Sequence, residues 1–196
     1  MPGERIHGYH DDYVMSTERH PMQHLAELLR ESGFTNKRIG VEMENYYFSA
    51  AAWETLKREL PDAHFVDATA LVNWKRLRKS PAELAYIRQA AAIVTSMHET
   101  IRERIKPGLR KNELVAEIFA TGIRGAEGGG GDYPAIVPLL PTGKDASAAH
   151  LTWDDKPFER GAATFFEIAG CVRRYHARLC RTVYLGKPPL SLLDAE

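Results

Sequence analysis

The 196-residue sequence has little cysteine, no long apolar run and no net charge. Its two cysteines, Cys171 and Cys180, are too few for a disulfide framework or a zinc site, so we expect a reducing, cytoplasmic location. No apolar stretch approaches the roughly 20 residues that span a bilayer, and the polar first twelve residues do not fit a signal peptide. We therefore expect no membrane partner.

The absence of net charge excludes a further class of protein. The 26 Lys and Arg residues balance the 26 Asp and Glu residues. Nucleic-acid-binding proteins normally carry a basic excess, so we expect no nucleic-acid partner. Apolar residues make up 44% of the chain and charged residues 27%, which excludes a disordered, collagen-like or coiled-coil chain. The length fits one large domain or two small ones.

Helix and strand patterns alternate in the first third of the chain. Capping residues and apolar spacing predict helices over 21–32 and 49–60. Short apolar segments predict strands at 38–42 and 64–66. Strands that alternate with helices indicate an α/β layer.

The most regular pattern begins at Ser80, which is followed by Pro81 and by Glu83 at the third helical position, as in a capping box. Apolar residues then recur every three or four positions, at Leu84, Ile87, Ala91, Val94, Met97, Ile101 and Ile105. This pattern predicts a helix of about seven turns that stops at Pro107–Gly108, with His98 on its outer side. A second helix is expected over 111–122.

Strand patterns return after the glycine-rich patch at 125–131. Segment 133–140 predicts an edge strand, because two prolines interrupt it. Segments 163–169 and 175–185 predict a hairpin with its turn near Gly170. The expected fold class is therefore α/β (α+β), with a domain boundary between residues 78 and 79.

Two motifs lack the residues that their chemistry needs. The glycine patch is followed by Asp132-Tyr133-Pro134 and not by the Gly-Lys-Ser/Thr of a phosphate-binding loop, which favours a flexible loop. His20 and His24 have a zinc-like spacing, but Pro21 stands where a zincin has its glutamate. The second pattern favours a capping or solvent-exposed pair of histidines.

His150 and Glu167 are better candidates for chemistry. His150 lies in a polar loop near Trp153 and several acidic residues, where an imidazole suits acid/base catalysis, although a structural histidine fits the same pattern. Glu167 lies inside an apolar strand, where an unpaired charge is costly. Strand alternation places Phe165 and Glu167 on one face. Basic residues of the next strand could pair with Glu167 or bind an anionic substrate: Arg173, Arg174, His176, Arg178 and Arg181. The alternative is that Glu167 points to solvent.

Four segments occur in an order that resembles a known family: KSPAELAYIRQA (79–90), DYPAIV (132–137), SAAHLTW (147–153) and EIAGCVRRYHARLCRTVYLG (167–186). They resemble the pita-bread hydrolases, which include methionine aminopeptidase, aminopeptidase P, prolidase and creatinase. The pattern is most like the ectoine-hydrolase and creatinase-like branch. The resemblance implies that 1–78 is the C-terminal part of a creatinase-like N-terminal domain and 79–196 the N-terminal half of a pita-bread domain, so the chain looks truncated at both ends.

The resemblance also implies roles for the candidate residues. Metal-dependent members hold two divalent ions, of the Mn or Co type, partly through two Asp of this hairpin. Those positions fall on Glu167 and Arg178, and since Arg cannot bind a metal, we expect no cofactor for this chain and only Glu167 as a weak ligand candidate. His150 falls on a substrate-contacting histidine, which is the acid/base group of metal-free creatinase. His176 falls near a substrate-contacting tyrosine.

These implications predict a hydrolase or peptidase that cleaves a C–N bond in a small polar substrate or dipeptide. His150 would be the catalytic acid/base, and His176, Arg178 and Glu167 would bind the substrate. Two alternatives stay open: a truncated, catalytically inactive remnant, and a non-catalytic partner of a full-length homologue. The expected partner of the chain is a second copy of itself or that homologue.

Overall fold

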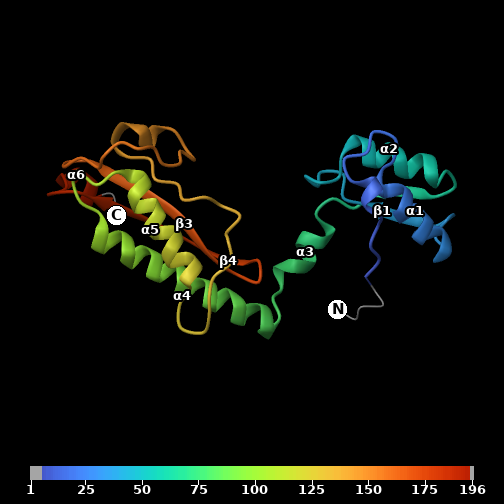
Figure 1. Cartoon of the computed structure of the whole chain (residues 1–196), viewed down its shortest axis with the longest axis horizontal. Helices are drawn as coiled ribbons and strands as arrows, with labels where there is room; N and C mark the ends of the chain where they lie inside the picture. The colour runs from blue at the N-terminus through green and yellow to red at the C-terminus, as the bar shows by residue number, and fades with distance from the viewer. Residues whose placement is uncertain (1–5, 195–196) are drawn as a thin grey trace. The chain divides into compact units, whose positions relative to one another are not determined.

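The computed structural model of the chain describes residues 6–194 (Figure 1). Contacts between Cα atoms divide the chain into two units, residues 1–78 and 79–196. Each unit has its own buried apolar residues. Among the described residues, no helix is both long and apolar enough to cross a membrane.

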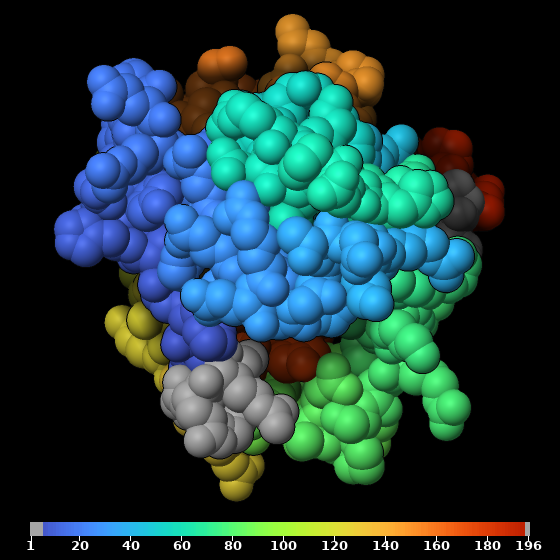
Figure 2. Space-filling model, turned by 90° about the vertical axis from the view of Figure 1, so that its right-hand side faces the viewer, coloured from blue at the N-terminus to red at the C-terminus, as the bar shows by residue number. Residues whose placement is uncertain are grey.

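The first unit is a small α/β layer, whose surface faces the viewer in Figure 2 as the blue-to-cyan atoms. Its elements are the 3-10 helix η2 (Asp11–Tyr13), α1 (Pro21–Glu31), β1 (Arg38–Val41), α2 (Ala50–Glu59), β2 (His64–Asp67) and α3 (Leu71–Leu77). Strands β1 and β2 pair in parallel, with α2 as the connection between them, and α1 packs against α2. The alternation expected from the sequence is confirmed. The buried apolar residues of this unit are Ala26, Val41, Ala52, Leu56 and Leu60.

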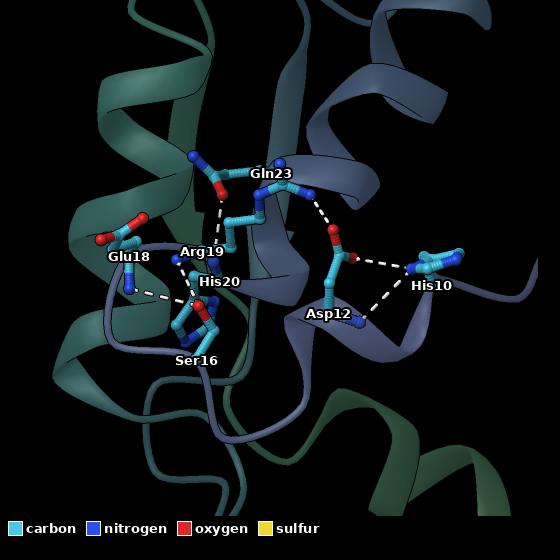
Figure 3. A network of polar contacts seen from close by, with 7 residues as sticks. All are labelled: His10, Asp12, Ser16, Glu18, Arg19, His20 and Gln23. Atoms are coloured by element: carbon cyan, nitrogen blue, oxygen red, sulfur yellow. Dashed lines mark hydrogen bonds and ion pairs between the residues drawn. The ribbon is translucent and has the colours of Figure 1, made fainter.

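His20 caps the start of helix α1, which is one of the two roles expected for the histidine pair. The His20 Nδ1 atom accepts a hydrogen bond from the Met22 backbone N–H at 3.2 Å, and the Gln23 side chain accepts one from the His20 backbone N–H at 3.0 Å. Figure 3 shows this cap beside the ion pair of Asp12 with Arg19. His20 therefore satisfies a free N–H group at the helix terminus, as a capping histidine does.

The second unit places two helices on one face of a β-hairpin (Figure 1). Its elements are α4 (Pro81–Arg104), α5 (Lys111–Arg124), the 3-10 helix η3 (Gly143–Ser147), β3 (Ala163–Val172), β4 (Tyr175–Tyr184) and α6 (Leu190–Leu193). Helix α4 packs against both strands and against α5. The core between them is formed by Ile93, Val94, Met97, Ile101, Leu114, Val115, Ile118, Leu140, Phe158, Phe166 and Ile168.

Helix α4 has the predicted start, and Val94, Met97 and Ile101 of the predicted face are buried. The Ser80 hydroxyl accepts a hydrogen bond from the Glu83 N–H at 3.3 Å, and the Glu83 carboxylate accepts one from the Ser80 N–H at 2.7 Å, which confirms the capping box. Ala91, predicted to face inward, is exposed, whereas Ala90 and Ile93 are buried. The prediction from apolar spacing was therefore wrong at Ala91. Ala90 and Ala91 fit the helical period about equally well, and packing against the hairpin decides which of them is buried.

The hairpin turn lies at Arg173–Arg174 and not near Gly170. Both arginines have left-handed backbones, with φ of 50° and 65°, as a two-residue turn between twisted strands requires. Gly170 lies within β3 and faces α4, where a Cβ atom would come within 2.2 Å of the Ala90 carbonyl oxygen. This glycine therefore allows close packing of strand and helix and does not form the turn.

Segment 133–140 is not the strand that its apolar pattern predicts. It forms only an isolated bridge to β3, in which Leu139 and Glu167 exchange backbone hydrogen bonds of 3.0 and 2.9 Å. A second bridge joins Thr142 to Thr164. Prolines at 134, 138 and 141 interrupt a regular ladder because they lack an N–H donor. The bridges hold the segment along the edge of β3 that β4 does not occupy.

Candidate active site

A pocket of about 220 Å3 lies beside β3, where the loop that contains His150 meets the strand that contains Glu167. Its walls are mainly apolar, and they combine residues that lie up to 28 positions apart in the sequence. The lining residues are Leu139, Pro141, Ala146, Ala148, Ala149, His150, Phe165 and Glu167. The structure thus places the proposed proton-transfer residue and the buried carboxylate on the walls of one pocket.

Glu167 does not point to solvent, since its side chain is only 12% exposed. The Arg178 guanidinium donates a hydrogen bond from Nη1 to Glu167 Oε1 at 3.0 Å. Arg178 pairs with Ala169 in the hairpin register, two positions from Glu167 and on the same face. Of the basic side chains considered from the sequence, Arg178 is therefore the one that pairs with this carboxylate.

His150 is held in an unusual backbone conformation. Its φ is 63°, in the left-handed region, which is uncommon for residues other than glycine although histidine is among the enriched types. The adjacent backbone is fixed by a hydrogen bond from the Leu140 N–H to the Leu151 carbonyl at 3.1 Å. Left-handed residues of this kind cluster at functional sites. The side chain is exposed, so solvent and a small ligand can reach the imidazole.

His176 holds a loop and does not line this pocket. Its Nε2 atom accepts a hydrogen bond from the Ala135 N–H at 2.9 Å, and its Nδ1 atom lies 3.0 Å from the Arg174 carbonyl oxygen, to which it can donate. Arg174 strengthens the attachment through its N–H to Asp132 at 3.3 Å and its guanidinium over the Tyr133 ring at 4.2 Å. These contacts fasten the loop to the tip of the hairpin.

The two cysteines are free and differ in their surroundings. Cys171 is buried, and burial raises the pKa of its thiol, which makes it a poor nucleophile at neutral pH. Cys180 is partly exposed and pairs with Glu167 in the hairpin register. Neither thiol lines the pocket that contains His150.

The sequence prediction for His98 was wrong. This side chain lies between α4 and β4, and its Nε2 atom is 3.1 Å from the Leu179 carbonyl oxygen. Burial lowers the pKa of His98. The hydrogen bond to the Leu179 carbonyl raises this pKa, whereas the positive charge of Arg181 lowers it further. The signal was present in the sequence, because His98 lies four residues after Val94 and three before Ile101, both of which are buried.

Two family models match the chain. The model of metallopeptidase family M24 matches residues 85–195, and the model of the creatinase/prolidase N-terminal domain matches residues 1–78. The order of the two matches agrees with the pita-bread resemblance found in the sequence.

Comparison with individual relatives shows what share of their length this chain covers. The chain is 55% identical to ectoine hydrolase of Halomonas elongata, over all of this chain and 51% of that protein. It is 38% identical to an uncharacterized hydrolase/peptidase of Sinorhizobium fredii, over 99% of this chain and 50% of that protein. The chain therefore spans about half the length of the curated relatives that it matches.

A solved structure shows the same fold. X-Pro aminopeptidase from Thermotoga maritima superposes with a TM-score of 0.73 at 22% identity, over 88% of this chain and 46% of that chain. The shared architecture is a creatinase-type N-terminal domain followed by the first part of a pita-bread domain.

A metallopeptidase family implies a metal centre, which requires several donor side chains close together. Within residues 6–194, no three His, Cys, Asp or Glu side chains lie close enough together to hold an ion. The Glu167 carboxylate is hydrogen-bonded to the Arg178 guanidinium, which has no acceptor atom and repels a cation. The donor set of the described residues therefore does not fit a metal.

Proposed function

The chain belongs to metallopeptidase family M24, and from this premise we propose that it takes part in the hydrolysis of a C–N bond in a small polar substrate. The observation that carries the proposal is the single pocket lined by both His150 and Glu167. An imidazole and a carboxylate in one small pocket are typical of proton-transfer catalysis.

His150 has the role of acid/base in this proposal. An imidazole can accept a proton from the attacking water and return it to the departing nitrogen near neutral pH. The new C–O bond forms as the proton leaves the water, and the C–N bond breaks as the nitrogen takes the proton. The exposed ring of His150, on a backbone of left-handed conformation, is suited to these two transfers.

The substrate class is proposed from the relatives and from the size of the pocket. The 55% identical relative is named for ectoine, a cyclic amidine, whereas the structural neighbour is named for X-Pro peptides. A volume of about 220 Å3 is below the roughly 300–1,000 Å3 that drug-sized ligands fill. Pocket size therefore favours the cyclic amidine over a dipeptide.

Turnover assays with ectoine and with an Xaa-Pro dipeptide test the proposal. Product formation by the purified chain should be detectable by NMR for ectoine, and His150→Ala should reduce the rate by about 10²- to 10⁴-fold. The matched control is His64→Ala, which removes an exposed histidine of the first unit. Unchanged turnover in His150→Ala, or no turnover of either substrate by the unaltered chain, contradicts the proposal.

The length of the relatives favours a second candidate function. Because the chain spans about half of each relative, it could act as a non-catalytic partner of a full-length homologue or of a second copy. This candidate predicts a complex in sedimentation velocity when the chain and the homologue are mixed, with no turnover by the chain alone. We also propose a cytoplasmic location, which fits the two free cysteines.

A further inference from the structure

We propose that Glu167 and Arg178 form a two-part recognition site for a small zwitterion that carries a planar cation and a carboxylate. Glu167 binds the cation inside the pocket, and Arg178 binds the carboxylate at its rim. This inference rests on the proposed function, because it names the substrate class of the same pocket. It adds specificity roles for two residues that the proton-transfer step does not use.

The surroundings of Glu167 favour a cationic ligand. Its carboxylate is largely withdrawn from water, and the only charged group recorded against it in residues 6–194 is Arg178, which contacts Oε1. An ionised carboxylate can accept about four hydrogen bonds, so most of its capacity is available to a ligand. The apolar side chains of Leu139, Pro141 and Phe165 lie beside the carboxylate, and an apolar surrounding strengthens a charge-assisted bond.

The geometry of a carboxylate selects a planar cation over an ammonium group. Its two oxygens accept two parallel N–H bonds from an amidinium or a guanidinium, whereas an ammonium offers no such fork. His150 lines the same pocket, so a cation held by Glu167 would lie in the pocket that contains the proposed acid/base residue.

Arg178 is placed to bind the opposite charge. Its side chain is 66% exposed, and the contact with Glu167 involves Nη1 alone. A guanidinium has five N–H donors in a rigid fork, so the remaining donors can bind a carboxylate in a bidentate manner. Arg178 does not line the pocket itself, and it therefore acts where the ligand meets solvent.

The charge balance and the volume define the ligand further. Apart from Glu167, the only residue of the pocket wall that can carry a charge is His150, so Glu167 and Arg178 together present no net charge. A dianion would be repelled by Glu167 and a dication by Arg178, whereas a zwitterion can place one opposite charge beside each of them. About 220 Å3 corresponds to roughly seven water molecules at about 30 Å3 each, which suits a single ring. Ectoine, a ring amidinium with a carboxylate, has this chemistry.

Isothermal titration of the purified chain with three probes tests the inference. The probes are ectoine, its carboxamide, which lacks the negative charge, and cyclohexanecarboxylate, which lacks the cation. Glu167→Gln should weaken ectoine and carboxamide binding by about tenfold or more, the size expected for a lost charge-assisted bond. Arg178→Gln should weaken ectoine binding similarly and leave carboxamide binding unchanged. Cyclohexanecarboxylate should bind the unaltered chain at least tenfold more weakly than ectoine.

The matched control is Arg181→Gln, an exposed arginine of the same strand on the opposite face, which should bind all probes like the unaltered chain. Far-UV circular dichroism and urea unfolding of each variant separate lost binding from lost folding, and Arg178→Lys, which keeps the charge, serves as a second variant. Equal losses for ectoine and carboxamide in Arg178→Gln, or no measurable ectoine binding by the folded chain, overturn the inference. Binding that follows the predicted pattern without turnover supports the inference and contradicts the hydrolase proposal alone.

Discussion

The two faces of strand β3 differ sharply although they alternate along the same ten residues. Phe166 and Ile168 are fully buried against the helices, whereas Phe165 and Glu167 line the pocket on the opposite side. The period of two in a strand makes this division possible, because successive side chains point to opposite faces. One face thus stabilises the fold, and the same backbone presents a carboxylate at a fixed position.

The difference between the faces extends to what covers them. Helices α4 and α5 pack over the core face, while the pocket face is met by a loop that touches β3 through isolated bridges. A regular strand such as β3 holds a functional side chain at a defined position. The less densely packed face of the strand leaves space for a ligand. The four predictions below test this contrast, beginning with the largest expected effect.

Removal of an aromatic ring should have very different consequences on the two faces. Phe166→Ala should lower the free energy of unfolding by about 3–5 kcal/mol, because it leaves a cavity in the core. Phe165→Ala should cost clearly less, since that ring is only partly buried at the pocket. Urea unfolding of both variants measures the difference, and equal losses would show that the two faces contribute alike to stability.

An added methyl group should test the close contact between β3 and α4. Gly170→Ala would bring Cβ within 2.2 Å of the Ala90 carbonyl oxygen and 2.9 Å of the Val94 nitrogen. We expect a loss of about 1–3 kcal/mol, as for other overpacked cores. Gly8→Ala is the control, because nothing lies within 4 Å of its Cβ position. A neutral Gly170→Ala would mean that the helix can move away from the strand without cost.

The tip of the hairpin is tied to the start of α4 by a group that titrates in acid. The backbone N–H and the hydroxyl of Ser80, followed by the Tyr175 hydroxyl, lower the pKa of Glu83 from 4.5 to about 2. Because the folded-state pKa is the lower one, the stabilisation is complete above pH 4.5 and is lost as the pH falls through about 2. The difference in unfolding free energy between the unaltered chain and Glu83→Gln should therefore shrink over this range.

Tyr175→Phe sharpens that measurement. It removes one of the hydroxyl groups that act on Glu83 and keeps the ring stacked on Tyr86, whose centroid lies 5.7 Å away. The acid-dependent part of the stability should become smaller but persist, because the Ser80 contacts remain. A pH profile identical to that of the unaltered chain would show that Tyr175 does not act on Glu83 in solution.

The smallest expected effect concerns the two thiols. Cys180 is partly exposed, whereas Cys171 is buried and its thiol has a raised pKa. Iodoacetamide should therefore modify Cys180 well before Cys171 in the folded chain, as peptide mass spectrometry would show. Both thiols should react at similar rates in urea. Faster labelling of Cys171 in the folded chain would indicate that the covered end of the hairpin opens readily.

Local patterns predicted those parts of the fold that depend on neighbouring residues. The Ser80–Glu83 capping box, the alternation in the first unit and the position of Phe165 and Glu167 on one face of β3 follow from sequence spacing. The strand expected over 133–140 and the turn expected near Gly170 were wrong. In both cases a contact with a residue far away in the sequence decides the outcome. Segment 133–140 is held by an isolated bridge to β3, and Gly170 allows the close approach of α4.

The sequence by itself determined the helix starts, the alternation of the strands and the presence of a carboxylate in an apolar strand, because each depends on residues within a few positions. Only the tertiary structure decided that Glu167 pairs with Arg178 and shares a pocket with His150, and that His176 holds a loop. These outcomes depend on hairpin register and on the loop path, which bring together residues 11 to 41 positions apart. Which of these distant residues come into contact is decided by strand register and packing, and no local sequence pattern specifies it.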